Sequence, residues 1–218
     1  DGIRDQPRSR GLGDVYKRQV IILALVIRLY RIDWGLPWEY WGDEGTILSY
    51  VSYMGLNKTL NPYIFNYSSL VFYIALLVGS AVYAIINLFG AAIDWNTFWQ
   101  SFFGNPTILA SAARITQAII GGATVHFTYH LGRQINYKTG LISALIVGLS
   151  PLAIVESKKY GGDGIMALFT TIAVLETVKF FTHRRKIHFV IASLFAGLAA
   201  GTKYFGGLVL FSVWISLY

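Results

Sequence analysis

Long apolar stretches, separated by short polar segments, restrict this chain more than any other feature of its sequence. Apolar runs cover residues 68–92, 107–131, 139–155, 164–181 and 189–200, and two others begin at positions 20 and 208. A helix needs about 20 apolar residues to cross the hydrocarbon core of a bilayer. Charged residues make up 13% of the chain, where a soluble domain has about 25%. The sequence therefore predicts an all-α integral membrane protein, a polytopic bundle of transmembrane helices.

The two ends of the chain differ from the pattern between them. Residues 1–19 are polar and lack the apolar core of a signal peptide, and residues 11–19 resemble translated sequencing-adapter sequence. We interpret residues 1–19 as a non-native or disordered segment. Only eight apolar residues precede Arg28, and the run that begins at 208 reaches the last residue. We therefore expect residues 20–218 to be the N-terminal part of a membrane domain that is truncated at both ends.

The basic residues indicate an orientation in the membrane. The net charge of +7 could suggest nucleic-acid binding, but the cations lie at the ends of apolar runs, where they orient membrane proteins. We expect the basic segments 133–138 and 183–188 to face the cytoplasm, and residues 33–67, 156–163 and Lys203 to face outward. Two apolar runs, 68–92 and 107–131, lie between the first loop and Arg133. A loop outside and a basic segment inside require an odd number of crossings between them. Either one of these two runs does not cross the membrane, or one loop has the opposite orientation. We predict that residues 68–92 re-enter or break, near Gly79.

Other segments carry patterns of shorter elements. Residues 46–53 are helix-like, and the aromatic residues of segment 94–106 recur at helical spacing, as in an amphipathic helix at the membrane interface. We expect interfacial helices in the first external loop. Residues 139–155 are predicted to form a single span. The chain contains no cysteine, which excludes disulfide and thiol chemistry.

An acidic pair in the first loop is the first candidate site. Asp43 and Glu44 lie between Gly42 and Gly45, directly after Trp41. Glycine allows a tight turn and a close approach to a ligand, and a carboxylate near the bilayer surface can act as a general base or hold a divalent cation. The alternative is an ordinary solvated acid in a loop.

A second group of charged residues follows the run 139–155. Glu156, Lys158, Lys159 and Asp163 lie within eight positions, and charges this dense at the end of a span are costly unless they face water or a cavity. Asp163 could be the N-cap of the next helix. It could instead be a second acid beside a phosphate-bearing ligand, with Lys158 or Lys159 contacting the phosphate.

Three more polar residues could contribute to a site. Arg114 lies about two turns inside a predicted span, where a charge needs a partner or a route to the interface. Lys203 and Tyr204 stand between two apolar runs. Lys203 could contact a phosphate, or it could simply anchor a helix end.

These motifs, taken in order, resemble a known enzyme family. The matching stretches are Leu36-Pro37 with Gly42-Asp43-Glu44, residues 60–70, Ala113-Arg114, Leu131 to Arg133, Gly140-Leu141, Leu149 to Pro151, residues 157–163 and Gly201 to Tyr204. The chain resembles the integral-membrane glycosyltransferases of the GT-C fold, and among them the dolichyl-phosphate-mannose–protein mannosyltransferase-like family, which includes the bacterial aminoarabinose transferases. The family often has His-Pro or a similar pair before the acidic pair, where this chain has Trp41-Gly42.

The resemblance implies a reaction and roles for the residues. A sugar passes from a polyprenyl-phosphate donor to a protein, lipid or glycan acceptor at the extracytoplasmic face, with inversion at the sugar carbon. Asp43 matches the position of the base, with Glu44 beside it, and Asp163 matches the acid of the second external loop. Lys203 and Arg114 match recurrent basic positions. Asp43 and Asp163 are candidates for holding a divalent metal ion, and the expected location is the plasma membrane of a prokaryote.

Two other functions fit the composition. A transporter or lipid flippase would carry charged residues along a path through the bundle, whereas here they gather in the loops. A non-catalytic subunit of a membrane assembly would tolerate substitution of every loop acid.

Overall fold

The chain folds into a bundle of α-helices. The structure is a computed structural model and describes residues 7–38 and 42–217. The helices are α1 (Pro7–Leu29), α2 (Gly42–Leu56), α3 (Leu70–Leu88), α4 (Trp95–Ser101), α5 (Thr107–Gly132), α6 (Tyr137–Leu149), α7 (Pro151–Glu156), α8 (Gly162–His183), α9 (Lys186–Thr202), η1 (Tyr204–Val209) and α10 (Leu210–Ile215). Three of them, α3, α5 and α8, are long and apolar enough to cross a membrane. No strand occurs within the described ranges, and the predicted all-α membrane protein is confirmed.

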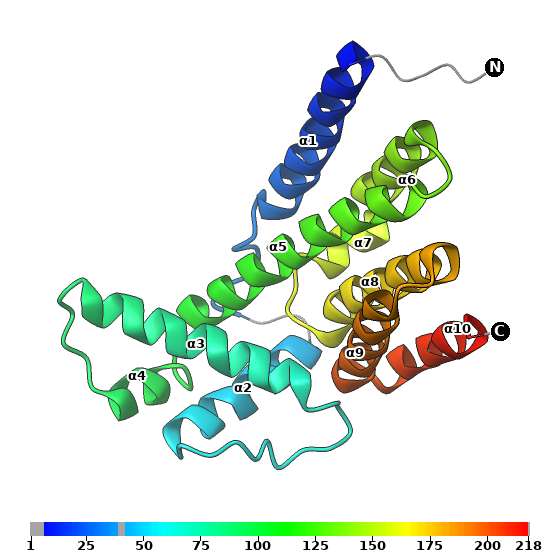
Figure 1. The fold of residues 1–218 in the computed structure, drawn as a ribbon. Coiled ribbons are helices and arrows are strands. Elements are labelled where there is room, and N and C mark those ends of the chain that lie inside the picture. Colours follow the sequence, from blue (N-terminus) through cyan, green and yellow to red (C-terminus); the bar gives the residue numbers. More distant parts are fainter. Residues whose placement is uncertain (1–6, 39–41, 218) are drawn as a thin grey trace, which may run out of the picture.

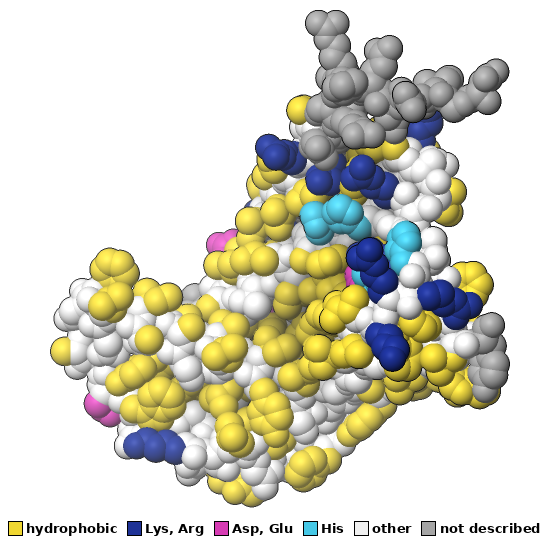
Figure 2. Space-filling model, viewed as in Figure 1, with side chains coloured by type: hydrophobic (Ala, Val, Ile, Leu, Met, Phe, Trp, Pro, Cys, Tyr) yellow, Lys and Arg dark blue, Asp and Glu magenta, His cyan; other side chains and the backbone are white. Residues whose placement is uncertain are grey.

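The bundle has one basic end. Helix α5 packs against α1, α6 and α8, α1 also packs on α6, and α9 packs on α8. Figure 1 shows that the α5–α6 and α8–α9 connections lie at the same end of the bundle. The cations predicted to face the cytoplasm belong to these two connections, and Figure 2 shows Lys, Arg and His side chains gathered there. The connections α7–α8 and α9–η1 lie at the opposite end (Figure 1).

Helix α3 departs from the prediction made for residues 68–92. It runs without interruption from Leu70 to Leu88, so the predicted break near Gly79 is wrong. A side chain at Gly79 would overlap the ring of Trp99, which is fully buried. The glycine therefore permits close packing rather than a break. In Figure 1, α3 runs at a large angle to α5 and α8, which favours the other predicted possibility, an element that does not cross with the bundle.

The aromatic segment 94–106 forms the short helix α4. The carboxylate of Asp94 caps it by accepting hydrogen bonds from the amides of Asn96 and Thr97, at 3.0 and 3.1 Å. Its Phe98 and Trp99 are buried in the core shared with α2 and α3. The helical spacing of the aromatic residues was therefore the spacing of a face that packs against protein.

The predicted single span over residues 139–155 is broken in the structure. Helix α6 ends at Leu149, and α7 starts at Pro151. Ser150 is extended because the proline ring disfavours a helical conformation at the residue before it. Pro151 also lacks the N–H that the Val147 carbonyl would accept in a continuous helix. The guanidinium of Arg28 fills this gap, donating to Val147 O at 3.3 Å and to Gly148 O at 2.9 Å.

The N-terminal segment is helical in the part that the structure describes, and residues 1–6 lie outside the described residues. Residues 7–19, interpreted as non-native or disordered, are helical and continuous with residues 20–29 in α1. Arg28 seemed to end the apolar run of this helix, yet its side chain is 1% exposed. It also donates to the Ser157 hydroxyl at 3.2 Å. The first helix is therefore bonded to both sides of the α6–α7 break.

Candidate active site

The acidic pair opens α2 and divides between two environments. Both Asp43 and Glu44 lie in the first turn of this helix, where the unpaired amides and the helix dipole favour negative charge. Asp43 is exposed and accepts a hydrogen bond of 2.8 Å from the Tyr67 hydroxyl. This hydrogen bond to the carboxylate raises the pKa of Tyr67. Trp41, which precedes the pair, lies outside the described residues.

Glu44 is fully buried in an ion pair with Arg114. The two guanidinium nitrogens Nε and Nη2 donate to the two carboxylate oxygens at 2.9 and 2.6 Å, a bidentate geometry that strengthens such pairs. Arg114 also donates to the carbonyls of Ile32 and Trp34. The Tyr160 amide donates to Glu44 Oε1 at 2.9 Å. Both oxygens of Glu44 are thus engaged, and Arg114 has the partner that its depth in α5 requires.

Arg114 and Glu44 connect four parts of the chain. Glu44 starts α2, Arg114 lies inside α5, Ile32 and Trp34 follow α1, and Tyr160 precedes α8. A catalytic role was predicted for Glu44 and a ligand contact for Arg114, and in the structure these two charged groups contact each other. The buried pair holds the first loop against the bundle. Asp43 is the member of the acidic pair that reaches solvent.

Asp163 pairs with Lys203 at the same end of the bundle. The Lys203 Nζ lies 2.5 Å from Asp163 Oδ1, and both side chains are nearly half exposed. Asp163 is not the N-cap of α8, because Gly161 occupies that position and Asp163 lies in the first turn. The ion pair joins the start of α8 to the end of α9. Its exposure leaves both groups accessible to a ligand.

Tyr204 connects this pair to the first loop. Its hydroxyl donates to the carbonyl of Phe65 at 2.9 Å, and Phe65 lies two residues before Tyr67, the partner of Asp43. Asp43 and Asp163 therefore lie at the same end of the bundle. This is the arrangement on which a shared aqueous site depends.

A small cavity lies beside the Glu44–Arg114 pair. It has a volume of about 210 Å³ and is lined by Tyr30, Arg31, Trp34, Arg114, Val155 and Lys158. Lys158 Nζ donates to the Tyr30 carbonyl at 2.8 Å. Lys159 lines no part of this cavity and pairs with Glu156 at 2.8 Å. The cavity therefore presents Arg31 and Lys158 as cations.

Sequence reasoning did not single out Arg31 or Tyr67. Arg31 follows the first helix, next to the aromatic Trp34, and a cation directly after a span was the signal that could have identified it. Tyr67 carries no such signal, because its partner Asp43 is 24 residues away.

The described residues do not form a metal centre. No three His, Asp or Glu side chains within them are grouped closely enough to hold a metal ion. Asp43 and Asp163, the predicted metal candidates, contact Tyr67 and Lys203 respectively. Neither contact brings a second carboxylate to the same point.

The fold and the site define a class of protein, a helical membrane protein with carboxylates and cations gathered at one end of its bundle. The comparison with known families is more specific. Residues 98–218, more than half of the chain, match the family model of the dolichyl-phosphate-mannose-protein mannosyltransferases, and the chain belongs to this family. No curated protein and no solved structure matches it.

Family membership implies a glycosyltransferase that uses a lipid-linked sugar donor in the membrane. The matched residues include Arg114, Lys158, Lys159, Asp163, Lys203 and Tyr204. Asp43 and Glu44 precede the match, so their roles depend on the geometry of the site.

Proposed function

We propose that this protein transfers a sugar from a polyprenyl-phosphate donor to an acceptor hydroxyl or amine at the extracytoplasmic face, with Asp43 as the general base. The observation that carries the proposal is the division of the acidic pair. Glu44 is locked in the core by Arg114, while Asp43 faces solvent and is oriented by Tyr67. A base must reach the proton that it removes, and Asp43 meets this requirement.

The reaction is a displacement at the anomeric carbon. The acceptor heteroatom forms a bond to this carbon while the bond from the carbon to the phosphate oxygen breaks. The acceptor proton passes to the Asp43 carboxylate, and the lipid phosphate leaves with the bonding electron pair. Attack from the face opposite the phosphate inverts the configuration at the carbon.

The leaving phosphate needs positive charge where the bilayer meets water. Cations placed at the developing charge stabilise such a transition state. Arg31 and Lys158 supply them in the cavity of about 210 Å³. Lys203 and Asp163, both accessible, contact the donor's phosphate and sugar hydroxyls, and Tyr204 lies beside them. Lys159 keeps its pairing with Glu156 at the rim.

The charge distribution supports an extracytoplasmic site. The positive-inside rule assigns the basic connections to the cytoplasm, and the candidate site lies at the other end of the bundle (Figure 1). The sugar then stays at the outer interface while the prenyl chain stays in lipid. The three helices that are long and apolar enough to cross a membrane fit a multi-pass protein, and the plasma membrane of a prokaryote fits this arrangement.

Substitution of Asp43 tests the proposal. In the full-length protein, Asp43→Asn keeps the shape of the side chain and removes the base, and we expect sugar transfer to fall by about 10²–10⁴-fold. Asp33→Asn removes the same charge from an exposed position of the same loop and serves as the matched control. Transfer is measured with a radiolabelled polyprenyl-phosphate sugar, and gel filtration in detergent checks folding.

Wild-type turnover by a folded Asp43→Asn variant would remove Asp43 from the mechanism. Movement of a labelled solute across reconstituted vesicles, without any sugar transfer, would instead favour a transporter or flippase. If every loop acid tolerates substitution, a non-catalytic subunit becomes the better description.

A further inference from the structure

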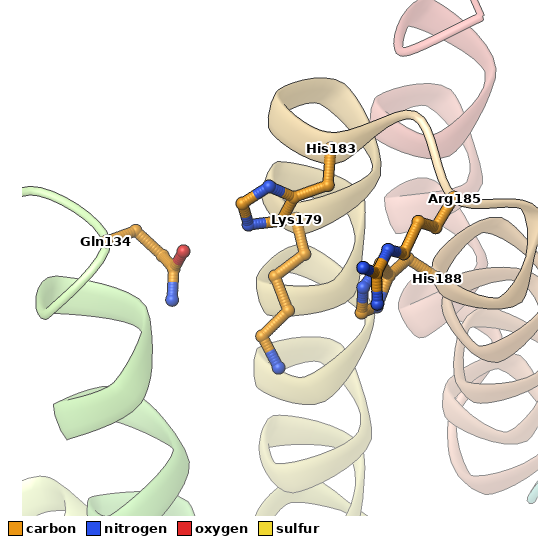
Figure 3. Close-up of a pocket in the computed structure, with 5 residues that line it drawn as sticks. All are labelled: Gln134, Lys179, His183, Arg185 and His188. Carbon is orange, nitrogen blue, oxygen red and sulfur yellow. The ribbon is translucent and has the colours of Figure 1, made fainter.

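A second polar cavity lies at the basic end of the bundle, away from the candidate active site. Its volume is about 360 Å³, and its lining residues are Gln134, Lys179, His183, Arg185 and His188. Figure 3 shows these side chains coming from the α5–α6 connection, from α8 and from the start of α9. Gln134 faces Lys179 and His183 across the opening (Figure 3). The proposed sugar transfer uses none of the five.

The charge of this cavity is positive. Glu176 is the carboxylate bonded to its lining, and it accepts contacts from Lys179 Nζ at 2.7 Å and from His188 Nδ1 at 2.6 Å. Arg185 forms no ion pair with any residue in the described ranges. Its guanidinium is therefore the uncompensated cation of the cavity, and it is exposed.

The start of α9 adds to this positive potential. Arg185 is the N-cap residue of α9, a helix of 17 residues, and its side chain makes no capping hydrogen bond. The unpaired amides and the dipole at such a terminus favour a negatively charged ligand. The helix terminus, Arg185 and Lys179 thus act on the same opening.

We propose that this cavity binds a phosphate-bearing anion. Phosphate combines negative charge with several acceptor oxygens, and an arginine fork, a lysine and imidazole and amide donors match it. Two sources could supply it, the headgroup of an anionic phospholipid or a soluble phosphate compound.

The surroundings of the cavity favour the lipid. Basic pockets between helices at the cytoplasmic side of membrane proteins bind phospholipid headgroups. The neighbouring side chains of Phe181, Ile187 and Val190 are apolar and more than half exposed, so they offer a surface for acyl chains. A cavity of about 360 Å³ is also in the size range of sites for whole organic ligands rather than single ions.

Native mass spectrometry of the full-length protein tests this inference. The protein is released from micelles that contain equal amounts of phosphatidylglycerol and phosphatidylcholine, and retained lipids are counted. Arg185→Gln removes the uncompensated cation. Lys138→Gln removes an exposed cation from the same end of the bundle, outside the cavity lining, and is the matched control. A parallel titration measures the binding of inorganic phosphate by calorimetry.

We expect wild-type protein to retain phosphatidylglycerol in preference to phosphatidylcholine. Arg185→Gln should weaken this retention about tenfold, the effect of one lost charge-assisted contact, while Lys138→Gln leaves it unchanged. Binding of inorganic phosphate that depends on Arg185, without lipid preference, also supports the site and identifies a soluble source. Equal effects of the two substitutions, or no binding of either probe, overturn the inference.

Discussion

The buried pair between Glu44 and Arg114 yields the sharpest prediction about stability. Glu44→Gln keeps the volume of the side chain and an acceptor for the Tyr160 amide, but it leaves the Arg114 charge buried with a side chain only 2% exposed. Removing one member of a buried pair destabilises proteins by about 3–5 kcal/mol. Arg114 keeps the carbonyls of Ile32 and Trp34 as acceptors. We therefore expect a loss at the lower end, about 3 kcal/mol.

A double-mutant cycle separates the pair from other effects. Arg114→Met removes the charge while retaining a long apolar side chain, so the double variant Glu44→Gln/Arg114→Met buries no unpaired ion. We expect the double variant to lose less stability than the sum of the two single variants, by about 2 kcal/mol, within the range for residues in direct contact. The free energy of unfolding is measured by SDS titration in mixed micelles, followed by far-ultraviolet circular dichroism.

Glu156→Gln is the control for this cycle. It removes a carboxylate from an ion pair with Lys159 whose side chains are each about a quarter exposed, so a loss below about 1 kcal/mol is expected. If Glu44→Gln costs no more than Glu156→Gln, or if the cycle is additive within about 0.5 kcal/mol, the pair does not hold the first loop and the reasoning fails.

Two further predictions follow from packing and from the orientation of the base. Gly55→Ala places a methyl group against the buried ring of Trp99 and should lower the free energy of unfolding by about 1–3 kcal/mol. The control, Gly197→Ala, places its methyl group in open space on α9 and should not lower the free energy of unfolding. Equal effects of the two substitutions in the same SDS titration would contradict this packing. Tyr67→Phe should slow sugar transfer about tenfold by freeing Asp43. Because the pKa of Tyr67 is raised above its ordinary value of 10, the Tyr67 hydroxyl keeps its proton up to pH 10 and loses it only as the pH rises through the raised value. The rate difference between wild type and Tyr67→Phe should therefore be constant over the neutral and alkaline range up to pH 10, and a difference that changes between pH 6 and 9 would assign the effect to another group.

The class of fold could be predicted from the sequence because it depends on local composition. Apolar runs predict the helices, and the cations beside them predict the helix ends, without any knowledge of tertiary contacts. The break between α6 and α7 was equally local, since Ser150-Pro151 carries its own steric rule, and the prediction of one span gave that rule too little weight. The direction of α3, in contrast, could not be predicted from its local sequence. Its 19 apolar residues satisfy the length of a span, and only its packing with α2 and α4 shows that it follows another direction.

The residue types at the candidate site could be predicted from the sequence but their contacts could not, and the acidic pair shows why. Adjacent residues on an α-helix project about 100° apart, so a helix that starts at Gly42 must direct Asp43 and Glu44 to different surroundings. Which acid enters the core is decided by Arg114, 70 residues away, and no local pattern contains that information. Because the two residues are so far apart in the sequence, Glu44 was not recognised as the partner of Arg114, and a ligand contact was predicted for Arg114. Once the partner is known, the two residues form one unit: Arg114 holds Glu44 in a buried ion pair at the start of α2, from which Asp43 reaches the solvent.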